Sequence, residues 1–438
     1  MKFYLYLSDI LYLLFCMFSM YWIWKSAHNT ANQKVWNKIF QQETAVISAS
    51  ILVFFVLISM LDSIHIYKGY SMTLLDLLFS PLNIVMEYSY SKPFSATSFI
   101  PKVIHEASGY QQVYPHLSYV PEALKNSHDV SSWLIKTALT LSFYYWGACL
   151  FLWVVFKSKW QKLYRPYRIS VTTIGVMIWL ILFLYLLSRS IHVFGTGQIG
   201  QDIFYQAVKS IRTGLFISSM TTIIILPFSL ILGLSAGYFG GVVDDIIQFI
   251  YTVIGSIPSV LLISAALLSW QLFQEMYYPK WSMMKQADVR LLVICVLLGL
   301  TNWASLCRYI RAEVFKLREM NYVKAARLLG SSSAFILRQH LLPNVMHMVI
   351  ITVILDFSYY ILAESVLTYV GIGVSPSTMS WGNMINAARL ELARTPVVWW
   401  PLVTAFGFMF TVVLVCNLLA DAVRKALNPK EEIFTQRT

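Results

Sequence analysis

Charged residues are scarce in this chain of 438 residues: only 12% are Asp, Glu, Lys or Arg, whereas 58% are hydrophobic. Soluble domains carry about 25% charged residues, so this composition excludes an ordinary soluble enzyme and predicts an integral membrane protein. The net charge of +12 does not indicate a nucleic-acid binder, because the basic residues cluster at the ends of apolar segments. They form no basic face with aromatic stacking platforms.

Motifs for catalysis and for metal or nucleotide binding are also missing. The five cysteines include no close pair such as CxxC, so they predict neither a disulfide framework nor a zinc site. Four histidines share one segment, but the spacing of His65, His105, His116 and His128 fits no metal-ligand pattern. Nowhere does the sequence contain GxxxxGKS or GxxxxGKT, the phosphate-binding loop of ATPases. We therefore expect no catalytic residue, no metal and no cofactor.

Long apolar runs are what the chain does contain. Since about 20 apolar residues cross the hydrocarbon layer, nine stretches predict membrane spans: residues 10–24, 44–61, 137–156, 169–187, 213–239, 246–270, 291–307, 345–370 and 396–420. The first resembles a signal segment, but no small-residue cleavage site follows it, so we interpret it as a retained anchor. Pro227 and Pro258 fall inside spans and predict kinks, which serve either gating or packing.

Basic residues are concentrated in two connections, residues 157–168 and 308–338, which the positive-inside rule places in the cytoplasm. Counting spans from these connections puts Met1 outside and Thr438 inside. The nearly neutral segment 62–136 then lies outside. It is too long for a simple connection, and we expect it to fold against the membrane surface.

The stretch FGTGQIGQD, residues 194–202, has three glycines in the spacing of a dinucleotide-binding loop. Such a loop must follow a short buried strand, whereas this one follows a run long enough to span a membrane and lies outside. We reject nucleotide binding and expect the glycines to serve positive φ angles or close backbone approach.

The connection at residues 311–344 has the most informative pattern. Tyr322, Ala325, Ala326 and Leu329 recur at helical spacing, and Gly330 can end that helix as a left-handed cap. Residues 331–333 are serines that can cap a second helix, which must end before Pro343. Periodicity alone leaves two interpretations open: docking of a partner protein, or an interfacial helix on lipid headgroups.

The sequence NYVKAARLLGSSSAFILRQHLLPNV resembles the EAA loop of permease subunits in binding-protein-dependent ABC importers, and is closely similar to their peptide/nickel branch. The resemblance covers residues 192–429 and includes, in the family's order, GTGQIGQD against GTDxxGRD, LSAGYFGGVVDD, ILAESVLTYVGIGVSPSTMSWGNMI and LADAVRKALNPK. It implies an all-α integral membrane protein of about nine transmembrane helices, an ABC importer permease bundle with a cytoplasmic EAA coupling loop. The predicted segments are an N-terminal membrane region (1–190) with about four spans, a permease core (191–429) and a cytoplasmic tail (430–438).

This resemblance implies a multi-pass channel half in the bacterial cytoplasmic (inner) membrane, in contact with membrane lipid. The implied partners are a second permease subunit, two ATP-binding subunits and an extracytoplasmic solute-binding protein, with no nucleic acid. Oligopeptides or dipeptides are the expected substrates, and nickel chelates or peptide-like antibiotics remain open. An ion-coupled secondary transporter or a membrane sensor has less support, because we find no internal repeat, few intramembrane acids and no signalling domain.

The resemblance also indicates site residues. The ATPase-coupling loop would use Tyr322, Lys324, Ala325, Ala326, Leu329, Gly330, Pro343 and Asn344, with Gly330 essential for coupling; the extracellular mouth would use Gly195, Gly200, Asp202, Trp381 and Gly382.

Three departures from the family pattern are evident. Lys324 stands where the family has an acid, and Gly197 and Gln201 replace the acid and base of GTDxxGRD, so the ion pair expected in that loop is missing. Members commonly have one span before the glycine loop. Residues 44–61 would be that span here, with the outer segment and the 137–187 hairpin inserted after it.

The eighth predicted span contains two acids, Asp356 and Glu364. Placing a charged side chain in hydrocarbon costs ~2.5 kcal/mol or more on insertion scales, so we expect each of these acids to have a structural or functional role. Glu364 lies in the family's LAEA-type stretch, which favours a structural role. Asp356 has no such match, and two interpretations stay open: it lines the pathway and contacts a peptide's amino terminus, or it is satisfied within the bundle.

Overall fold

A computed structural model of the chain describes residues 2–67, 71–84, 86–87, 89–106, 109–118, 120–121, 130–155, 157 and 164–427. The chain divides into two compact units. The first consists of Met1–Leu5, Phe40–Thr213 and Met379–Val412, and the second of Tyr6–Ile39, Gly214–Thr378 and Val413–Thr438. These units interleave along the sequence, whereas the predicted segments 1–190 and 191–429 are consecutive, so the segment division stays a prediction.

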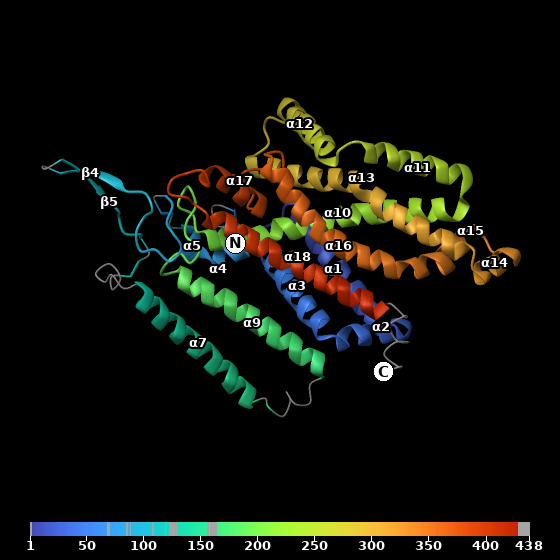
Figure 1. The fold of residues 1–438 in the computed structure, drawn as a ribbon, viewed down its shortest axis with the longest axis horizontal. Helices are drawn as coiled ribbons and strands as arrows, with labels where there is room; N and C mark the ends of the chain where they lie inside the picture. The colour runs from blue at the N-terminus through green and yellow to red at the C-terminus, as the bar shows by residue number, and fades with distance from the viewer. Residues whose placement is uncertain are drawn as a thin grey trace. The chain divides into compact units, whose positions relative to one another are not determined.

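Long helices make up most of both units (Figure 1). The first unit contains α3 (Glu43–Asp62), α4 (Leu74–Leu78), α5 (Ser80–Ile84), α7 (Val130–Val155), α9 (Arg165–Ser188) and α17 (Trp381–Glu391). The second contains α1 (Leu7–His28), most of α2 (Thr30–Gln41), α11 (Gly241–Ser256), α12 (Ser259–Tyr277), α13 (Met283–Arg318), α14 (Asn321–Leu328), α15 (Ser333–Phe335), a π-helical turn (Ile336–Leu341) and α16 (Leu342–Tyr369). Helices α10 (Ile203–Phe239) and α18 (Trp400–Leu427) each continue from one unit into the other.

The predicted helical membrane architecture is confirmed. In the described part of the chain, eight helices are long and apolar enough to cross a membrane: Leu7–His28, Glu43–Asp62, Arg165–Ser188, Ile203–Phe239, Ser259–Tyr277, Met283–Arg318, Ser333–Tyr369 and Trp400–Leu427. Seven of the nine predicted spans lie on these helices.

One predicted span differs from the structure. Residues 246–270 do not form one helix, because α11 ends at Ser256 and α12 begins at Ser259. Pro258 is the N-cap of α12, and Ile257 before it is extended (φ −92°, ψ 129°), as the residue before a proline prefers to be. The prediction that Pro258 lies inside a span is therefore wrong, whereas Pro227 does lie inside α10. Predicted span 137–156 lies on the 26-residue helix α7, apart from Phe156, which falls outside the described residues, and it stays a prediction.

In the second unit, two glycines one turn apart let α10 pack closely on α13. A Cβ added to Gly233 would lie 2.9 Å from Ile310 Cβ, and one added to Gly237 would lie 2.6 Å from Val314 Cβ. Small residues at this spacing are how helices approach in membranes, where apolar burial alone gives no driving force between helices. The surrounding core includes Trp303, Leu306, Cys307, Tyr238, Ile336, Leu341 and Val345.

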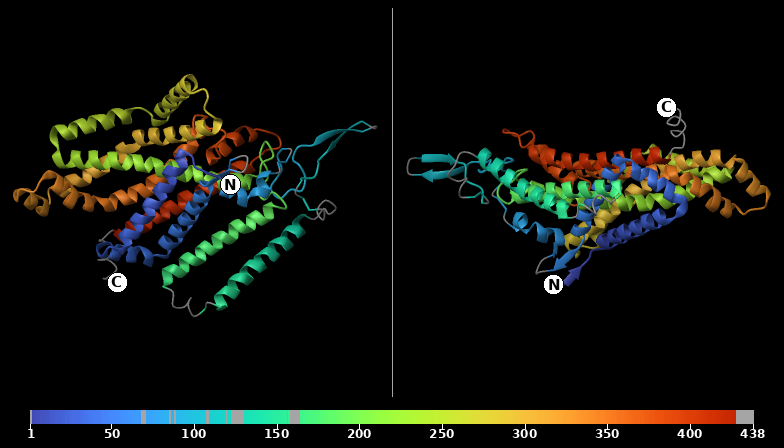
Figure 2. Two further views of the ribbon diagram at one scale, coloured as in Figure 1. Left: turned by 180° about the vertical axis from the view of Figure 1, so that it is seen from behind. Right: turned by 90° about the horizontal axis from the view of Figure 1, so that it is seen from below.

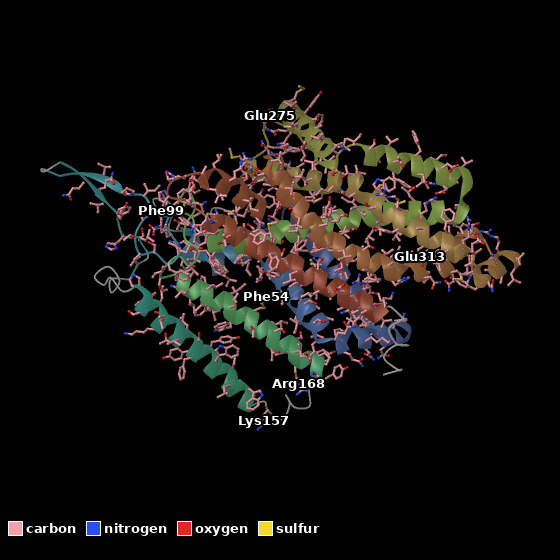
Figure 3. All side chains as sticks on the ribbon, viewed as in Figure 1. Phe54, Phe99, Lys157, Arg168, Glu275 and Glu313 are labelled. Atoms are coloured by element: carbon pink, nitrogen blue, oxygen red, sulfur yellow. The ribbon has the colours of Figure 1, made fainter. Side chains whose placement is uncertain are left out.

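In the first unit, α3 packs against α9, and α9 against α7. Ser50 Oγ donates a hydrogen bond to Ser170 Oγ at 2.9 Å between α3 and α9, and Tyr145 Oη donates to the carbonyl of Gly175 at 2.6 Å between α7 and α9. Figure 3 shows Lys157 and Arg168 near the ends of α7 and α9 that the chain connects, as the predicted basic connection requires.

Short strands occur in the first unit. β1 (Lys2–Tyr4) pairs antiparallel with β2 (His65–Tyr67), and β2 with β3 (Ser71–Thr73), while β4 (Lys102–Glu106) and β5 (Gly109–Val113) form an extended hairpin (Figure 2). The pairing of β1 with β2 places the first residues of the chain beside the segment that follows α3. Part of the predicted outer segment, residues 122–129, lies outside the described residues.

Candidate functional site

Between α13 and α16 the chain forms a projecting turn that we call the helical finger (residues 319–341), at one end of those two helices in Figures 1 and 2. Gly330 ends α14 with φ +80°, as predicted. Its N–H donates to the carbonyl of Arg327, and the N–H of Ser331 donates to that of Ala326, both at 3.1 Å, which is the Schellman pattern. Ser332 then caps α15, since its hydroxyl accepts the N–H of Phe335 at 3.3 Å.

The predicted stripe on α14 is divided between two faces. Ala326 and the unpredicted Val323 are buried in the core of the second unit. Tyr322 and Ala325 are exposed, and Leu329 is 86% exposed. Leu328, absent from the predicted set, is 88% exposed. Two adjacent leucines with almost no cover are an apolar patch that water solvates poorly.

The prediction that the second helix of the finger must end before Pro343 is wrong. The chain passes from α15 through the π-helical turn directly into α16, with Pro343 in its first turn. Proline is tolerated in the first turn of a helix, and a π-turn changes the hydrogen-bond spacing where its N–H is missing. Asn344 Nδ2 donates to the carbonyl of His340 at 2.6 Å and to Tyr322 Oη at 3.2 Å, so it ties α14 to the start of α16.

Lys324, which replaces the family's acid, has its own partner. Its Nζ lies 3.0 Å from Glu319 Oε2, and both side chains are more than half exposed. The hydrogen bond from Lys324 lowers the pKa of Glu319. The positive charge is thus paired within the finger. Arg327 lies over the ring of Tyr238, 5.1 Å from its centroid.

Arginines at the base of the finger connect α13 to the turn between α10 and α11. Arg318 Nη1 donates to the carbonyls of Gly237 and Tyr238, at 3.4 and 3.3 Å. Arg311 binds Asp244 through two hydrogen bonds, one of them from Nη2 at 2.7 Å, and these lower the pKa of Asp244. A bidentate pair of this kind fixes geometry as well as charge.

The glycine loop at residues 194–202 is held by backbone contacts. Gly195 and Gly200 have φ of +70° and +76°, in line with the expected positive angles. A Cβ on Gly200 would lie 1.8 Å from the carbonyl oxygen of Glu87, and one on Gly195 would lie 2.4 Å from that of Ser91. These close approaches come from residues upstream of the family resemblance.

A buried ion cluster, which we call the outer clamp (Glu87, His192 and Asp202), joins the same two segments. His192 Nδ1 lies 2.6 Å from Asp202 Oδ2, and its Nε2 lies 3.8 Å from Glu87 Oε1. Burial alone would lower the pKa of His192, but the two carboxylates outweigh it and raise the pKa to about 9, so the imidazole is charged at neutral pH. Ser118 N–H donates to Glu87 Oε1 at 2.7 Å, and Tyr205 N–H donates to Asp202 Oδ1 at 2.9 Å.

Sequence analysis assigned no role to Glu87 or His192. The only signal was indirect: the loop lacks the acid and base of GTDxxGRD, so another ion pair was needed to hold it.

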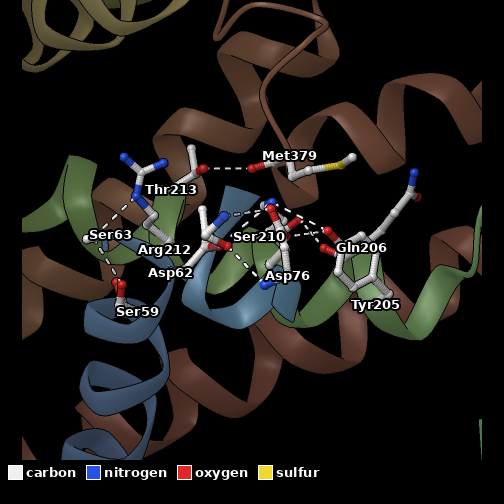
Figure 4. A network of polar contacts seen from close by, with 12 residues as sticks. Ser59, Asp62, Ser63, Asp76, Tyr205, Gln206, Ser210, Arg212, Thr213 and Met379 are labelled. Carbon is white, nitrogen blue, oxygen red and sulfur yellow. Dashed lines mark hydrogen bonds and ion pairs between the residues drawn. The ribbon is translucent and has the colours of Figure 1, made fainter. Parts of the chain in front are cut away.

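A second buried network joins the end of α3 to the start of α10 (Figure 4). Lys209 Nζ pairs with Asp76 and lies 3.8 Å from Asp62 Oδ1. Thr73 Oγ1 donates to Asp62 at 2.7 Å, and Tyr205 Oη donates to Asp76 at 2.5 Å. Burial would raise the pKa of Asp76, but Lys209, together with hydrogen bonds from Thr73 and Tyr205, outweighs it and lowers that pKa. The start of α10 is therefore anchored by charge as well as by packing.

Trp381 and Gly382 are buried at the start of α17. Trp381 Nε1 donates to the carbonyl of Ala207 at 3.0 Å, and Ser380 Oγ caps α17 by accepting the N–H of Asn383 at 3.0 Å. Both residues position α17 and do not line an open surface.

A cavity of about 180 Å³ lies between the glycine loop and α17 in the first unit. Its polar lining includes Tyr90, Gln201, Gln206 and Glu391. Burial and the Glu391 carboxylate raise the pKa of Tyr90 to about 12, so its phenol stays protonated and can donate a hydrogen bond. Sequence analysis did not identify this cavity.

The two acids of α16 have opposite surroundings. Glu364 is buried and accepts hydrogen bonds from Thr368 Oγ1 at 2.8 Å and from Ser365 Oγ at 3.2 Å. Thr368 in turn accepts the N–H of Val374, so Glu364 supports the turn after α16. Asp356 is half-buried and, in the described part of the chain, has no hydrogen-bond or ion-pair partner.

No metal-binding arrangement is present within the ranges that the structure describes, where no group of three or more His, Cys, Asp or Glu side chains could hold an ion. The five cysteines are all unpaired thiols.

In the part of the chain that the structure describes, eight helices long and apolar enough to cross a membrane define an integral membrane protein, and the helical finger joins two of them. Residues 229–433 match the family described as binding-protein-dependent transport system inner membrane component. The chain is 29% identical over 239 residues to the oligopeptide transport system permease protein OppC of Bacillus subtilis (strain 168), covering 55% of this chain and 72% of that protein.

It is also 30% identical over 239 residues to the dipeptide transport system permease protein DppC of the same strain, covering 55% of this chain and 69% of that protein. DppC of Alkalihalophilus pseudofirmus is 30% identical over 241 residues, which cover 72% of its length. The chain therefore belongs to the family of binding-protein-dependent transport system inner membrane components, the permease subunits of ABC importers.

Proposed function

We propose that this chain is a permease subunit of an ABC importer for peptides, forming the transmembrane pathway with a second permease subunit. Two separate ATP-binding subunits drive import, one of them docking on the helical finger of this chain, and an extracytoplasmic binding protein delivers the substrate. The observation that carries this proposal is the exposed apolar face of the finger, with Leu328 and Leu329 88% and 86% exposed. A groove on the ATPase would cover these side chains by helix-in-groove recognition.

The finger is built to transmit movement to the spans. Val323 and Ala326 are buried in the same core as α10, α13 and α16, and Asn344 ties Tyr322 to the start of α16. A displacement of α14 would therefore move α13 and α16 with it. Alternating access would follow as a largely rigid-body movement of packed helices.

The roles of the predicted coupling residues follow from these positions. Tyr322, Ala325, Leu329 and Gly330 would contact the ATPase, Ala326 would hold α14 on the core, and Pro343 and Asn344 would form the joint with α16. Lys324, paired with Glu319, would contribute little to docking.

Peptides are the proposed substrate because two relatives that align with this chain over 239 residues are named oligopeptide and dipeptide transport system permease proteins. The same machinery importing nickel chelates or peptide-like antibiotics is the second candidate. Substrate choice would rest largely with the binding protein.

We place the chain in the bacterial inner membrane, with its N-terminus outside and its C-terminus in the cytoplasm. The basic connections support this orientation through the positive-inside rule. Pairing of β1 with β2 is consistent with this orientation, since it puts the N-terminus on the same side as the segment after α3, which that rule places outside.

The mouth residues would act by holding backbone in place. Gly195, Gly200 and Asp202 shape the glycine loop, and Trp381 and Gly382 set the start of α17, so the binding protein would dock on a surface that these buried residues support. The chain itself would catalyse no reaction.

Deleting the gene and measuring uptake of radiolabelled trialanine tests the proposal. We expect uptake to be lost and to return with the wild-type gene. Purification from membranes should also recover an ATPase and a second permease. Unchanged uptake of di- and tripeptides in the deletion strain would contradict peptide import, and recovery of a self-sufficient carrier would contradict the ABC assignment.

A further inference from the structure

Asp356 lies well inside one of the eight candidate membrane spans, Ser333–Tyr369. It is near the midpoint of the 28-residue helix α16 (Leu342–Tyr369). At 1.5 Å per residue, about 20 Å of helix separates it from either end. This is the depth at which an ionised side chain is least tolerated unless it faces a partner or a water-filled cavity.

Acids elsewhere in the eight candidate spans are all satisfied within the chain. Each has a hydrogen-bond or ion-pair partner: Asp9, Glu43, Asp62, Glu275, Asp288, Glu313, Glu364 and Asp421. Among the spans as described, Asp356 is the one acid with none. In the part of the chain that the structure describes, this carboxylate is left to pair with a group from another molecule.

The surroundings of Asp356 suit a cation. Tyr359 and Tyr360 follow at i+3 and i+4 and so share its face of the helix, where Tyr359 is half exposed and Tyr360 is buried. A carboxylate beside aromatic rings binds ammonium groups through charge and cation–π contacts. A single carboxylate also suits transit, because a pathway site must release its ligand as readily as it binds it.

We infer that Asp356 is a pathway site for a primary ammonium group, the protonated amino terminus of the translocated peptide. This inference rests on the proposed function. The alternative partner, a cation on the second permease subunit, is an outcome of the test.

The test compares maximal rates of trialanine uptake in the deletion strain carrying wild type, Asp356→Asn, Asp356→Glu or Glu364→Gln, with the amount of assembled importer measured for each. Asparagine keeps size and polarity but removes charge, so we expect Asp356→Asn to lower the maximal rate at least tenfold. The half-saturating concentration should not change, because the binding protein sets it. Asp356→Glu should restore most of the rate. Glu364→Gln, the matched acid of the same helix, should lower rate and importer amount together.

Two results would overturn the inference. Wild-type maximal rate with Asp356→Asn would remove the carboxylate from the pathway. A fall in assembled importer equal to the fall in uptake would assign Asp356 to pairing with the second permease. Failure of the proposed function is a different result, since the deletion strain would then take up trialanine without the gene.

Discussion

The outer clamp buries charged side chains, whereas the helical finger exposes apolar ones. In the clamp, three ionisable groups are almost fully buried, yet Glu87, His192 and Asp202 satisfy one another and nearby backbone N–H groups. In the finger, Leu328 and Leu329 are apolar and almost fully exposed. The first region is complete within the chain, whereas the second would be covered by the proposed ATPase. Changes to the clamp should therefore cost stability, and changes to the finger should cost transport.

The largest expected effect is on the finger cap. Gly330→Asp should reduce peptide uptake at least 100-fold, because it places a charge beside the two exposed leucines. Asp tolerates the left-handed conformation better than most residues, and a Cβ at this position meets no atom within 4 Å. The protein should therefore insert normally, as judged by its amount in the membrane.

Gly371 provides a matched control. It ends α16 in the same Schellman pattern, with φ +89° and no atom within 4 Å of an added Cβ. Gly371→Asp should cost similar stability and leave most uptake intact. Equal loss of uptake in both variants would mean that Gly330 is only a helix cap, and wild-type uptake with Gly330→Asp would refute its role in coupling.

The next effect is on the clamp. His192→Ala leaves two buried carboxylates without their cation, and breaking a buried ion pair in this way costs about 3–5 kcal/mol. The unfolding temperature of the purified His192→Ala protein should therefore be lower than that of wild type. His116→Ala, at an exposed histidine of the outer segment, should change the free energy of unfolding by less than about 0.5 kcal/mol. Similar changes in the two variants would contradict the claim that the outer clamp stabilises the fold.

The pH dependence of stability sharpens the same point. The pKa of an unfolded histidine is about 6.5, whereas the two carboxylates raise the pKa of His192 in the folded chain to about 9. The stabilisation is then fully present below pH 6.5 and is lost as pH rises through 9. At 1.36 kcal/mol per pKa unit it amounts to about 3 kcal/mol. Unfolding temperatures measured from pH 6 to 10 should fall more steeply for wild type than for His192→Ala, and parallel curves would contradict the assignment.

The smallest effect is expected at Lys324. Its pair with Glu319 is solvent-exposed on both sides, and such pairs are screened by solvent and salt. Lys324→Ala should leave the unfolding temperature unchanged and alter uptake less than twofold. A large loss of uptake would show that the lysine contacts the ATPase directly.

The sequence predicted features that depend on local chemistry. Seven of the nine spans predicted from apolar length lie on helices able to cross a membrane. The Gly330 cap was predicted from a glycine at the end of an amphipathic run. The break at Pro258 was missed because apolar composition continues across it, although a proline after Ile257 was a local signal.

Long-range features could not be predicted. Glu87 and His192 are 105 positions apart, and each resembles an ordinary polar residue until the fold brings them together. Periodicity could not decide which face of α14 is buried, since Val323 and Ala326 on one face and Leu328 and Leu329 on the other are all apolar. The choice is made by packing against the core of the second unit.

Recovery of ATPase with the purified permease tests most directly whether the ATPase binds the exposed face of the finger. We expect the double variant Leu328→Asp, Leu329→Asp to reach the membrane in normal amount and to keep its second permease, but to lose the ATPase together with peptide uptake. Full recovery of ATPase with the double variant would contradict the claim that the exposed face of the finger is where the ATPase binds.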